Sequence, residues 1–136
     1  MIKQHGGVFR RNPTFNDVDV EGTLTVDTFA SSGFALEAAG IITEAGTSRT
    51  LSAGDNGKVI YCTSGSAVTV TTAAGLGAGF SCTIIQGGAG KVTVSQGAST
   101  TLASYSSLYS TMGQYAVISL LCPVADTFIA AGNLGV

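Results

Sequence analysis

Charged side chains are scarce in this sequence. Lys, Arg, Asp and Glu make up 10% of the 136 residues, whereas soluble proteins usually carry about 25%. The formal net charge is −2, so the composition provides no basic surface for nucleic acid or anionic lipid. We therefore expect neither a nucleic acid nor a membrane as a partner.

Long apolar runs, tryptophan and proline are absent or rare. No stretch approaches the roughly 18 apolar residues of a membrane helix, and residues 1–5 lack the apolar core of a signal peptide, which predicts a product that stays in the cell that makes it. The sequence has no Trp and 2 Pro, against 19 Gly. This composition favours close-packed strands joined by tight turns, and the length predicts one domain.

Cysteines are few and widely spaced. Cys62, Cys82 and Cys122 form no Cys-x-x-Cys pair and have no histidine nearby, which excludes the usual zinc and redox motifs. Each lies in an apolar, strand-like run, where a free thiol behaves as a small hydrophobic group. We predict buried, reduced thiols in preference to a disulfide.

The few charges are unevenly distributed. Residues 1–16 hold three bases and no acid, and residues 17–44 hold six acids and no base. The 86 residues that follow position 50 contain four charged side chains: Asp55, Lys58, Lys91 and Asp126. A solvated monomer normally needs more charge than this. The pattern predicts that much of the C-terminal surface is covered by copies of the same chain.

Residues 51–136 follow a pattern of short strands. The predicted strands are 58–62, 67–71, 80–85, 91–95, 100–105, 114–122 and 127–131. Valines alternate with hydroxyl residues in 67–71 and 91–95, and 114–122 is apolar on both faces, as expected for a central strand. The glycine-rich residues 87–90 are interpreted as a hairpin turn. Regular spacing of strands and turns predicts an all-β fold, a compact β-sandwich or barrel-like module.

The N-terminal part differs from this module. Residues 1–16 are basic and without long periodicity, and we interpret them as an extended N-terminal docking arm. Residues 17–50 are interpreted as a strand and a connection, because 17–26 alternates strictly between polar and apolar residues. Residues 31–48 are a small-residue connection, with one helical turn predicted at 34–38.

The usual signatures of catalysis and cofactor binding are not met. His5 is the single histidine and has no second base or metal ligand near it. The three carboxylates of residues 17–21 fit a solvated strand face better than a calcium loop. Residues 75–79 lack the spacing of a dinucleotide fingerprint, and 87–91 resemble a phosphate loop only superficially. We therefore expect no catalytic, cofactor or metal site.

The arm contains one pair of adjacent basic residues, Arg10 and Arg11, which lies between Phe9 and Phe15. A basic pair flanked by aromatic side chains is typical of a docking segment, in which aromatic and Arg side chains act as anchors. These four residues are the candidate partner-docking site. The alternative is a chain start without fixed structure.

Two stretches resemble known proteins. Residues 5–18, HGGVFRRNPTFNDV, are similar to the opening of virion proteins of marine and cyanobacterial tailed phages. Residues 51–60, LSAGDNGKVI, resemble a recurrent β-module of phage particle proteins, and residues 79–84, 113–116 and 128–132 follow the same module. The resemblance implies a homotrimer without enzymatic activity or cofactor, located in the virion after assembly in the host cytoplasm.

The chain lacks the long repetitive shaft and the large tip of a complete phage fibre. We therefore expect a capsid decoration, or cement, protein that binds the major capsid protein or another virion protein and stabilises the head shell. One alternative is a short tail-fibre or head-fibre component that contacts the host receptor. Another is a carbohydrate-binding module that uses Tyr105, Tyr109 and Tyr115 as stacking platforms.

Overall fold

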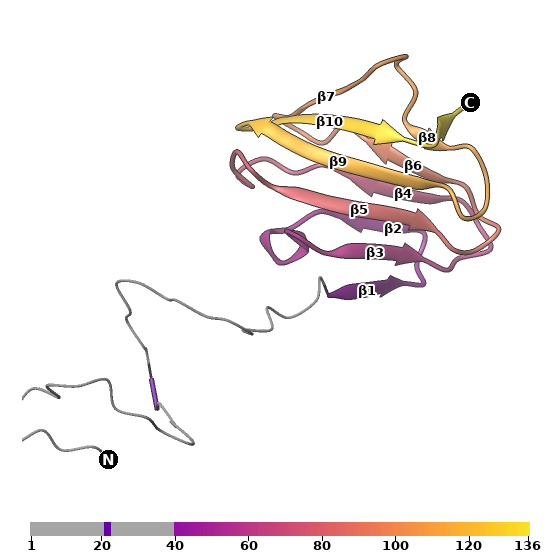
Figure 1. The fold of residues 1–136 in the computed structure, drawn as a ribbon, viewed down its shortest axis with the longest axis horizontal. Coiled ribbons are helices and arrows are strands. Elements are labelled where there is room, and N and C mark those ends of the chain that lie inside the picture. The colour runs from indigo at the N-terminus through magenta and orange to yellow at the C-terminus, as the bar shows by residue number, and fades with distance from the viewer. Residues whose placement is uncertain (1–20, 23–39) are drawn as a thin grey trace, which may run out of the picture. The chain divides into compact units, whose positions relative to one another are not determined.

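The computed structural model describes residues 21–22 and 40–136, and its strands all lie in the second of these ranges, called the module below (Figure 1). The strands are β1 (Ile41–Glu44), β2 (Ser48–Thr50), β3 (Val59–Cys62), β4 (Val68–Thr71), β5 (Ser81–Gln86), β6 (Val92–Ser95), β7 (Thr101–Ser104), β8 (Ser110–Thr111), β9 (Val117–Val124), β10 (Thr127–Gly132) and β11 (Leu134–Gly135). A short 3-10 helix, Ala53–Asp55, precedes β3. Within the described residues no helix is long and apolar enough to cross a membrane.

The strands form two sheets. Sheet A has six strands in the order β1-β3-β5-β9-β10-β7, and sheet B has five in the order β11-β8-β6-β4-β2. The first six strands alternate between the sheets, so that β1–β2, β3–β4 and β5–β6 each make one coil that runs through sheet A and returns through sheet B (Figure 1). Successive coils are parallel: β1, β3 and β5 pair side by side in sheet A, and β2, β4 and β6 do so in sheet B.

This topology corrects the interpretation of residues 87–90. A hairpin turn would join two antiparallel neighbours in one sheet, but β5 belongs to sheet A and β6 to sheet B. The glycines instead allow one arch to lie directly on the arch of the preceding coil. A Cβ atom on Gly88 would lie 2.2 Å from the Ser64 carbonyl oxygen, and one on Gly90 would lie 1.9 Å from that of Ser66.

The later strands close the stack at the side away from β1 and β2. In sheet A, β9 pairs antiparallel with β5 and with β10, and β7 pairs parallel with β10. In sheet B, β8 pairs antiparallel with β6 and with β11. On one side, strands β7 to β11 cover the stack of coils. On the other side the stack ends at β1, the edge strand of sheet A, and at β2, the edge strand of sheet B.

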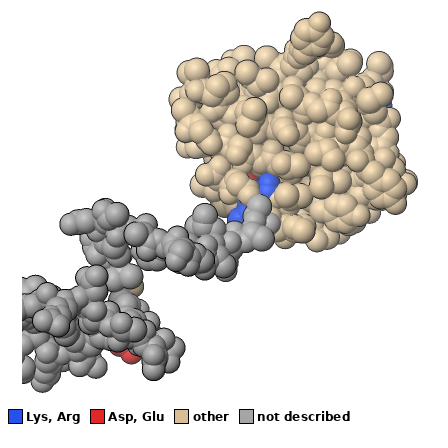
Figure 2. All heavy atoms as spheres, in the orientation of Figure 1, with Lys and Arg blue, Asp and Glu red and all other residues tan. Residues whose placement is uncertain are grey.

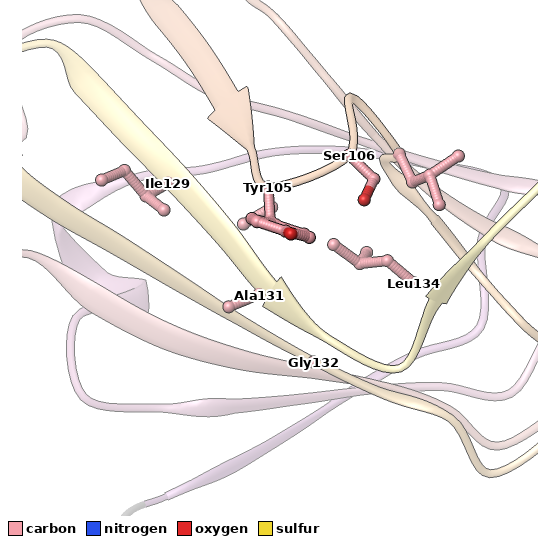
Figure 3. A pocket seen from close by; sticks show the side chains of 8 residues that line it. Tyr105, Ser106, Ile129, Ala131, Gly132 and Leu134 are labelled. Carbon is pink, nitrogen blue, oxygen red and sulfur yellow. The ribbon is translucent and has the colours of Figure 1, made fainter.

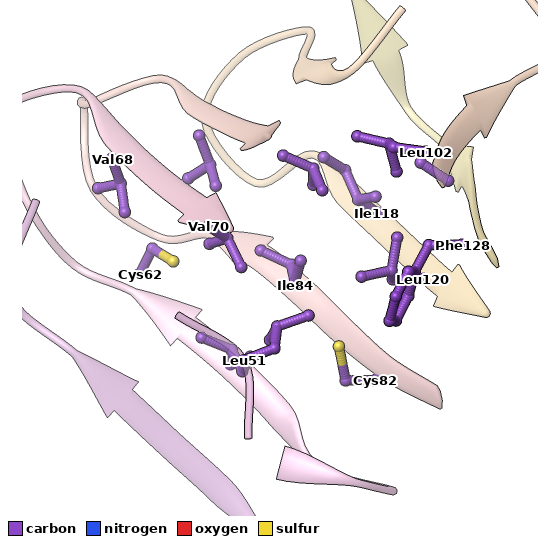
Figure 4. Packing of buried hydrophobic residues seen from close by; sticks show 14 of the residues in the cluster. Leu51, Cys62, Val68, Val70, Cys82, Ile84, Leu102, Ile118, Leu120 and Phe128 are labelled. Carbon is purple, nitrogen blue, oxygen red and sulfur yellow. The ribbon is translucent and has the colours of Figure 1, made fainter. Parts of the chain in front are cut away.

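The hydrophobic core lies between the two sheets (Figure 4). Aligned positions of parallel strands form columns, of which the clearest is Ile42, Ile60 and Ile84, continued by Ile118 of β9. From sheet B, the valines of β4 and β6 point inward and are 0–2% exposed, as their alternation predicts. Phe80 and Phe128 meet edge to face, with ring centroids 6.2 Å apart.

The all-β prediction is confirmed, because two packed sheets account for the module. Each of the seven predicted strands has a counterpart, from β3 to β7 and in β9 and β10. The interpretation of residues 41–50 mainly as a connection is corrected. Strands β1 and β2 lie in this range and pair with β3 and β4. The short strands β8 and β11 were also not predicted.

Candidate interaction surfaces

The outward side of sheet A is apolar. In β3, β5, β9 and β10 the residues that alternate with the buried ones point away from the core. We call this surface face A, and its larger apolar members are Val59, Tyr61, Ile85, Val117, Leu121 and Ile129. Leu121 is 49% and Ile129 is 40% exposed. Thr83, Ser119 and Ala131 lie between them, and none of these positions is charged.

Two shallow hollows lie on or beside face A. One, of about 190 Å³, is lined by Val59, Thr83, Ser119 and Leu121, with Lys58 at its border. The other, of about 270 Å³, lies near the ends of β7 and β10, where Tyr105 lies between Ile129 and Leu134 (Figure 3). Both are smaller than the ~300–1,000 Å³ typical of small-molecule sites. Their size suits single side chains of a partner.

The outward side of sheet B carries hydroxyl groups. We call this surface face B, and it consists of Ser48, Thr50, Thr69, Thr71, Thr93, Ser95 and Ser110. Register aligns Ser48, Thr69 and Thr93 in one row across three parallel strands. Thr93 Oγ1 and Ser110 Oγ are 2.8 Å apart and continue the row by a hydrogen bond. Face B is therefore polar but uncharged.

Three of the module's six charges form one cluster beside β1 and β2. The Arg49 guanidinium contacts Glu44 at 3.0 Å and Asp55 at 2.5 Å. The Arg49 position aligns with the inward Val70 and the Glu44 position with Cys62. The cluster therefore closes the core at the outermost coil, β1–β2. Asp55 is 1% exposed and also accepts the Ser52 N–H at 2.9 Å.

Hydrogen bonds in and around the cluster favour the charged forms of Glu44 and Arg49. The Gly46 N–H and then the Arg49 guanidinium lower the pKa of Glu44 below its ordinary value. The hydrogen bond to Asp55, which outweighs desolvation, raises the pKa of Arg49. These contacts pair the three charged groups with one another, although Arg49 Nε is buried without a hydrogen-bond partner. Mutual pairing of charges is the arrangement of a structural cluster.

The remaining charges of the module, Lys58, Lys91 and Asp126, are dispersed. Asp126 accepts the Gly75 N–H at 2.8 Å, and Lys91 donates to the Val136 backbone oxygen. In the view of Figure 2, acidic and basic atoms occupy only small spots of the module's surface. Across residues 40–136 three bases balance three acids.

The cysteines behave as predicted. Cys62, Cys82 and Cys122 are buried, and none forms a disulfide. Burial raises the pKa of the Cys62 thiol to about 11 and that of the Cys82 thiol to about 12. Since the thiolate is the reactive form, both are poor nucleophiles while the module is folded.

The three tyrosines proposed as sugar platforms are in different environments. Tyr109 packs against the core, and its hydroxyl donates to the Leu102 carbonyl at 3.3 Å. Tyr105 is fully exposed and Tyr115 is 69% exposed. The structure thus leaves two of the three rings accessible.

The candidate docking residues Phe9, Arg10, Arg11 and Phe15 lie outside the described residues, as does His5. The helical turn predicted at 34–38 and all of the strand predicted at 17–26 except residues 21–22 also lie outside them. Sequence reasoning singled out neither face A nor face B. The double-sided apolar pattern of residues 114–122 was the available signal for face A.

The motifs rejected for cofactors lie in connections. Residues 75–79 link β4 to β5 with three glycines at positive φ, and no helix follows them. Among the described residues, no group of three His, Cys, Asp or Glu side chains is placed to hold a metal ion. No protein-family model and no curated protein matches the sequence.

Proposed function

We propose that the protein is a non-enzymatic structural component of a tailed-phage particle, and specifically a decoration protein of the head shell. The observation that carries the proposal is face A, an apolar and uncharged sheet surface on a module with very few charges. Such a surface is typical of a protein whose normal state is assembled. The resemblance of residues 5–18 and 51–60 to virion proteins supplies the kind of particle.

In this proposal the module and the arm have separate tasks. The module makes a compact knob together with copies of itself, as a homotrimer. Residues 1–16 reach to the major capsid protein or another virion protein, with Phe9, Arg10, Arg11 and Phe15 as anchors. A protein that binds only the assembled shell stabilises it by mass action.

The second candidate is a short tail-fibre or head-fibre component. The exposed rings of Tyr105 and Tyr115 favour it, because exposed aromatic rings are suited to a receptor or a glycan. Copy number separates the two candidates: a decoration protein is present in hundreds of copies per particle and a fibre part in a few to a few tens. Quantitative mass spectrometry of purified particles measures this number.

Attachment to the shell is tested by deleting residues 1–16 and sedimenting the protein with undecorated particles. We expect the truncated chain to stay in the supernatant, because the anchors are gone, and to keep its β-type circular dichroism. Full-strength binding by the truncated chain would show that the arm is not the docking segment. Loss of the β signal would show that residues 1–16 are part of the fold.

A double substitution narrows the test to the basic pair. Arg10→Ala with Arg11→Ala should weaken attachment at least tenfold, since Arg anchors typically contribute about 2 kcal/mol or more. The matched control is Lys3→Ala, which removes a basic side chain of the same arm outside the aromatic-flanked pair. The control should bind like the unmodified chain.

A further inference from the structure

Face A has exposed apolar side chains that the described residues do not cover. Residues 114–122 are apolar on both faces, a pattern of strands buried on both sides. In β9 one side is buried in the core, whereas Leu121 on the other side is 49% exposed. Its registered neighbour in β10, Ile129, is 40% exposed. The pattern thus favours a second packed layer on this side, which residues 40–136 do not supply.

We propose that face A is the surface through which copies of this chain bind one another, so that the sheets A of the copies face a common axis. This inference rests on the assembled structural role proposed above and adds to it the surface that makes the contact. Face B then points outward, to solvent.

Charge favours a copy of the same chain as the occupant. The outward positions of β3, β5, β9 and β10 carry no charge, so two such faces meet without burying an unpaired ion from these strands. Lys58, which lines the hollow, directly precedes β3. Nucleic acid and anionic lipid need basic partners, which face A lacks. With three bases balancing three acids, the module also has little charge to keep it dispersed. Copies of the chain are present wherever the chain is, so this partner is always available.

The size of face A is sufficient. The flanking strands β1 and β7 extend face A with further uncharged outward residues, among them Ile41 and Ala103. The six strands then give five spacings of about 4.8 Å, and about six residues of about 3.3 Å along each strand make roughly 24 by 20 Å, or roughly 480 Å² per copy. Two such faces approach the ~1,000 Å² above which an interface is normally specific. The largest surface patches of monomers cover about 300–600 Å² and are often functional, and face A falls in this range.

The relief of face A suits packing of sheet on sheet. The hollow lined by Val59, Thr83 and Ser119 has Leu121, which is 49% exposed, as one of its walls. Facing sheets pack by interdigitating such side chains, at about 10 Å separation. A leucine of one copy therefore has a hollow of side-chain size to enter on the next.

The test compares one lysine on each face, in the full chain. Ser119 and Thr69 are both exposed hydroxyl residues on central strands, on face A and face B respectively. Light scattering at micromolar concentration should give the unmodified chain and Thr69→Lys three times the 13.6 kDa of one chain. Ser119→Lys should raise the dissociation constant at least tenfold and shift the mass towards one chain, with unchanged circular dichroism.

Two separate cysteine variants, one on each face, keep the test valid if Ser119→Lys fails to fold. Ser119→Cys and Thr69→Cys are mild changes, and the three native thiols are buried. A short bifunctional thiol reagent should join copies of Ser119→Cys and leave Thr69→Cys as single chains. Cross-linking of Thr69→Cys alone would overturn the assignment to face A, as would dissociation by Thr69→Lys but not by Ser119→Lys.

The two proposals fail in different ways. An unmodified chain that stays a monomer at micromolar concentration would overturn self-association through face A, whether or not it sediments with particles. A face A oligomer that does not bind any particle would overturn the decoration function and leave the interface standing.

Discussion

Arg49 shows how a single residue is placed at the boundary of the core. Its position aligns with Val70 and Val94, so its side chain takes a place that valines occupy in the next two coils. A guanidinium is tolerated there because Glu44 and Asp55 contact it at 3.0 and 2.5 Å. The cluster thus ends the apolar columns with a paired polar layer.

Removing the charge of Asp55 should destabilise the module. Asp55 is 1% exposed, and its two carboxylate oxygens accept from Arg49 and from the Ser52 N–H. Asp55→Asn removes the charge that faces Arg49 and puts an amide NH2 in place of one accepting oxygen, at a cost of about 2–3 kcal/mol. Urea unfolding followed by circular dichroism measures the change. Asp126→Asn is the control, because the amide oxygen can still accept the Gly75 N–H, and it should change stability by less than about 0.5 kcal/mol. Equal effects of the two substitutions would contradict a structural role for the cluster.

At the scale of the elements, the sequence predicted strands better than their arrangement. Alternation placed the valines of β4 and β6 in the core, because burial on one side has a period of two. It did not reveal parallel coils, since alternation is the same in parallel and antiparallel strands. Ser48–Thr50 was missed because it is three residues long and its inward residue is Arg49, paired by Glu44 and Asp55.

The candidate surfaces were less predictable than the strands. Scarcity of charge predicted a covered surface, but only the fold shows that Leu121 and Ile129 are neighbours across β9 and β10. Face B required knowing that β2, β4 and β6 align in one sheet. Both surfaces depend on pairing between residues distant in sequence, which local patterns do not encode.

Stacking of the coils depends on glycine at the arch between β5 and β6. Gly90 N–H donates to the Ser64 carbonyl at 3.0 Å, and a Cβ atom at Gly90 would lie 1.9 Å from the Ser66 oxygen. Gly90→Ala must push two arches apart and should destabilise the module by about 3 kcal/mol. Gly65→Ala, in the neighbouring arch, meets no atom within 4 Å and should change stability by less than about 0.5 kcal/mol. Thermal unfolding of both variants tests this, and a Gly90→Ala variant as stable as Gly65→Ala would refute direct stacking.

At the scale of the whole module, stability should differ between its two sides. Coils that contact only their neighbours resemble a one-dimensional array, whose free end opens more readily than its middle. Strands β1 and β2 have a partner on one side only, whereas β9 lies between β5 and β10. The three buried cysteines sample this axis, because Cys62, Cys82 and Cys122 lie in β3, β5 and β9.

Thiol labelling should therefore find Cys62 the least protected. The folded protein is alkylated at low denaturant concentration, and each labelling rate is compared with that of the same cysteine in the unfolded chain. Opening at Cys62 should cost at least about 1 kcal/mol less than opening at Cys122, because only one strand separates β3 from the edge. Asp55→Asn should lower the protection of Cys62 further and leave that of Cys122 unchanged, since the cluster lies beside the edge strands. Equal opening energies at all three cysteines, in both proteins, would mean that the two sheets open as one cooperative unit and that the parallel coils have no weaker end.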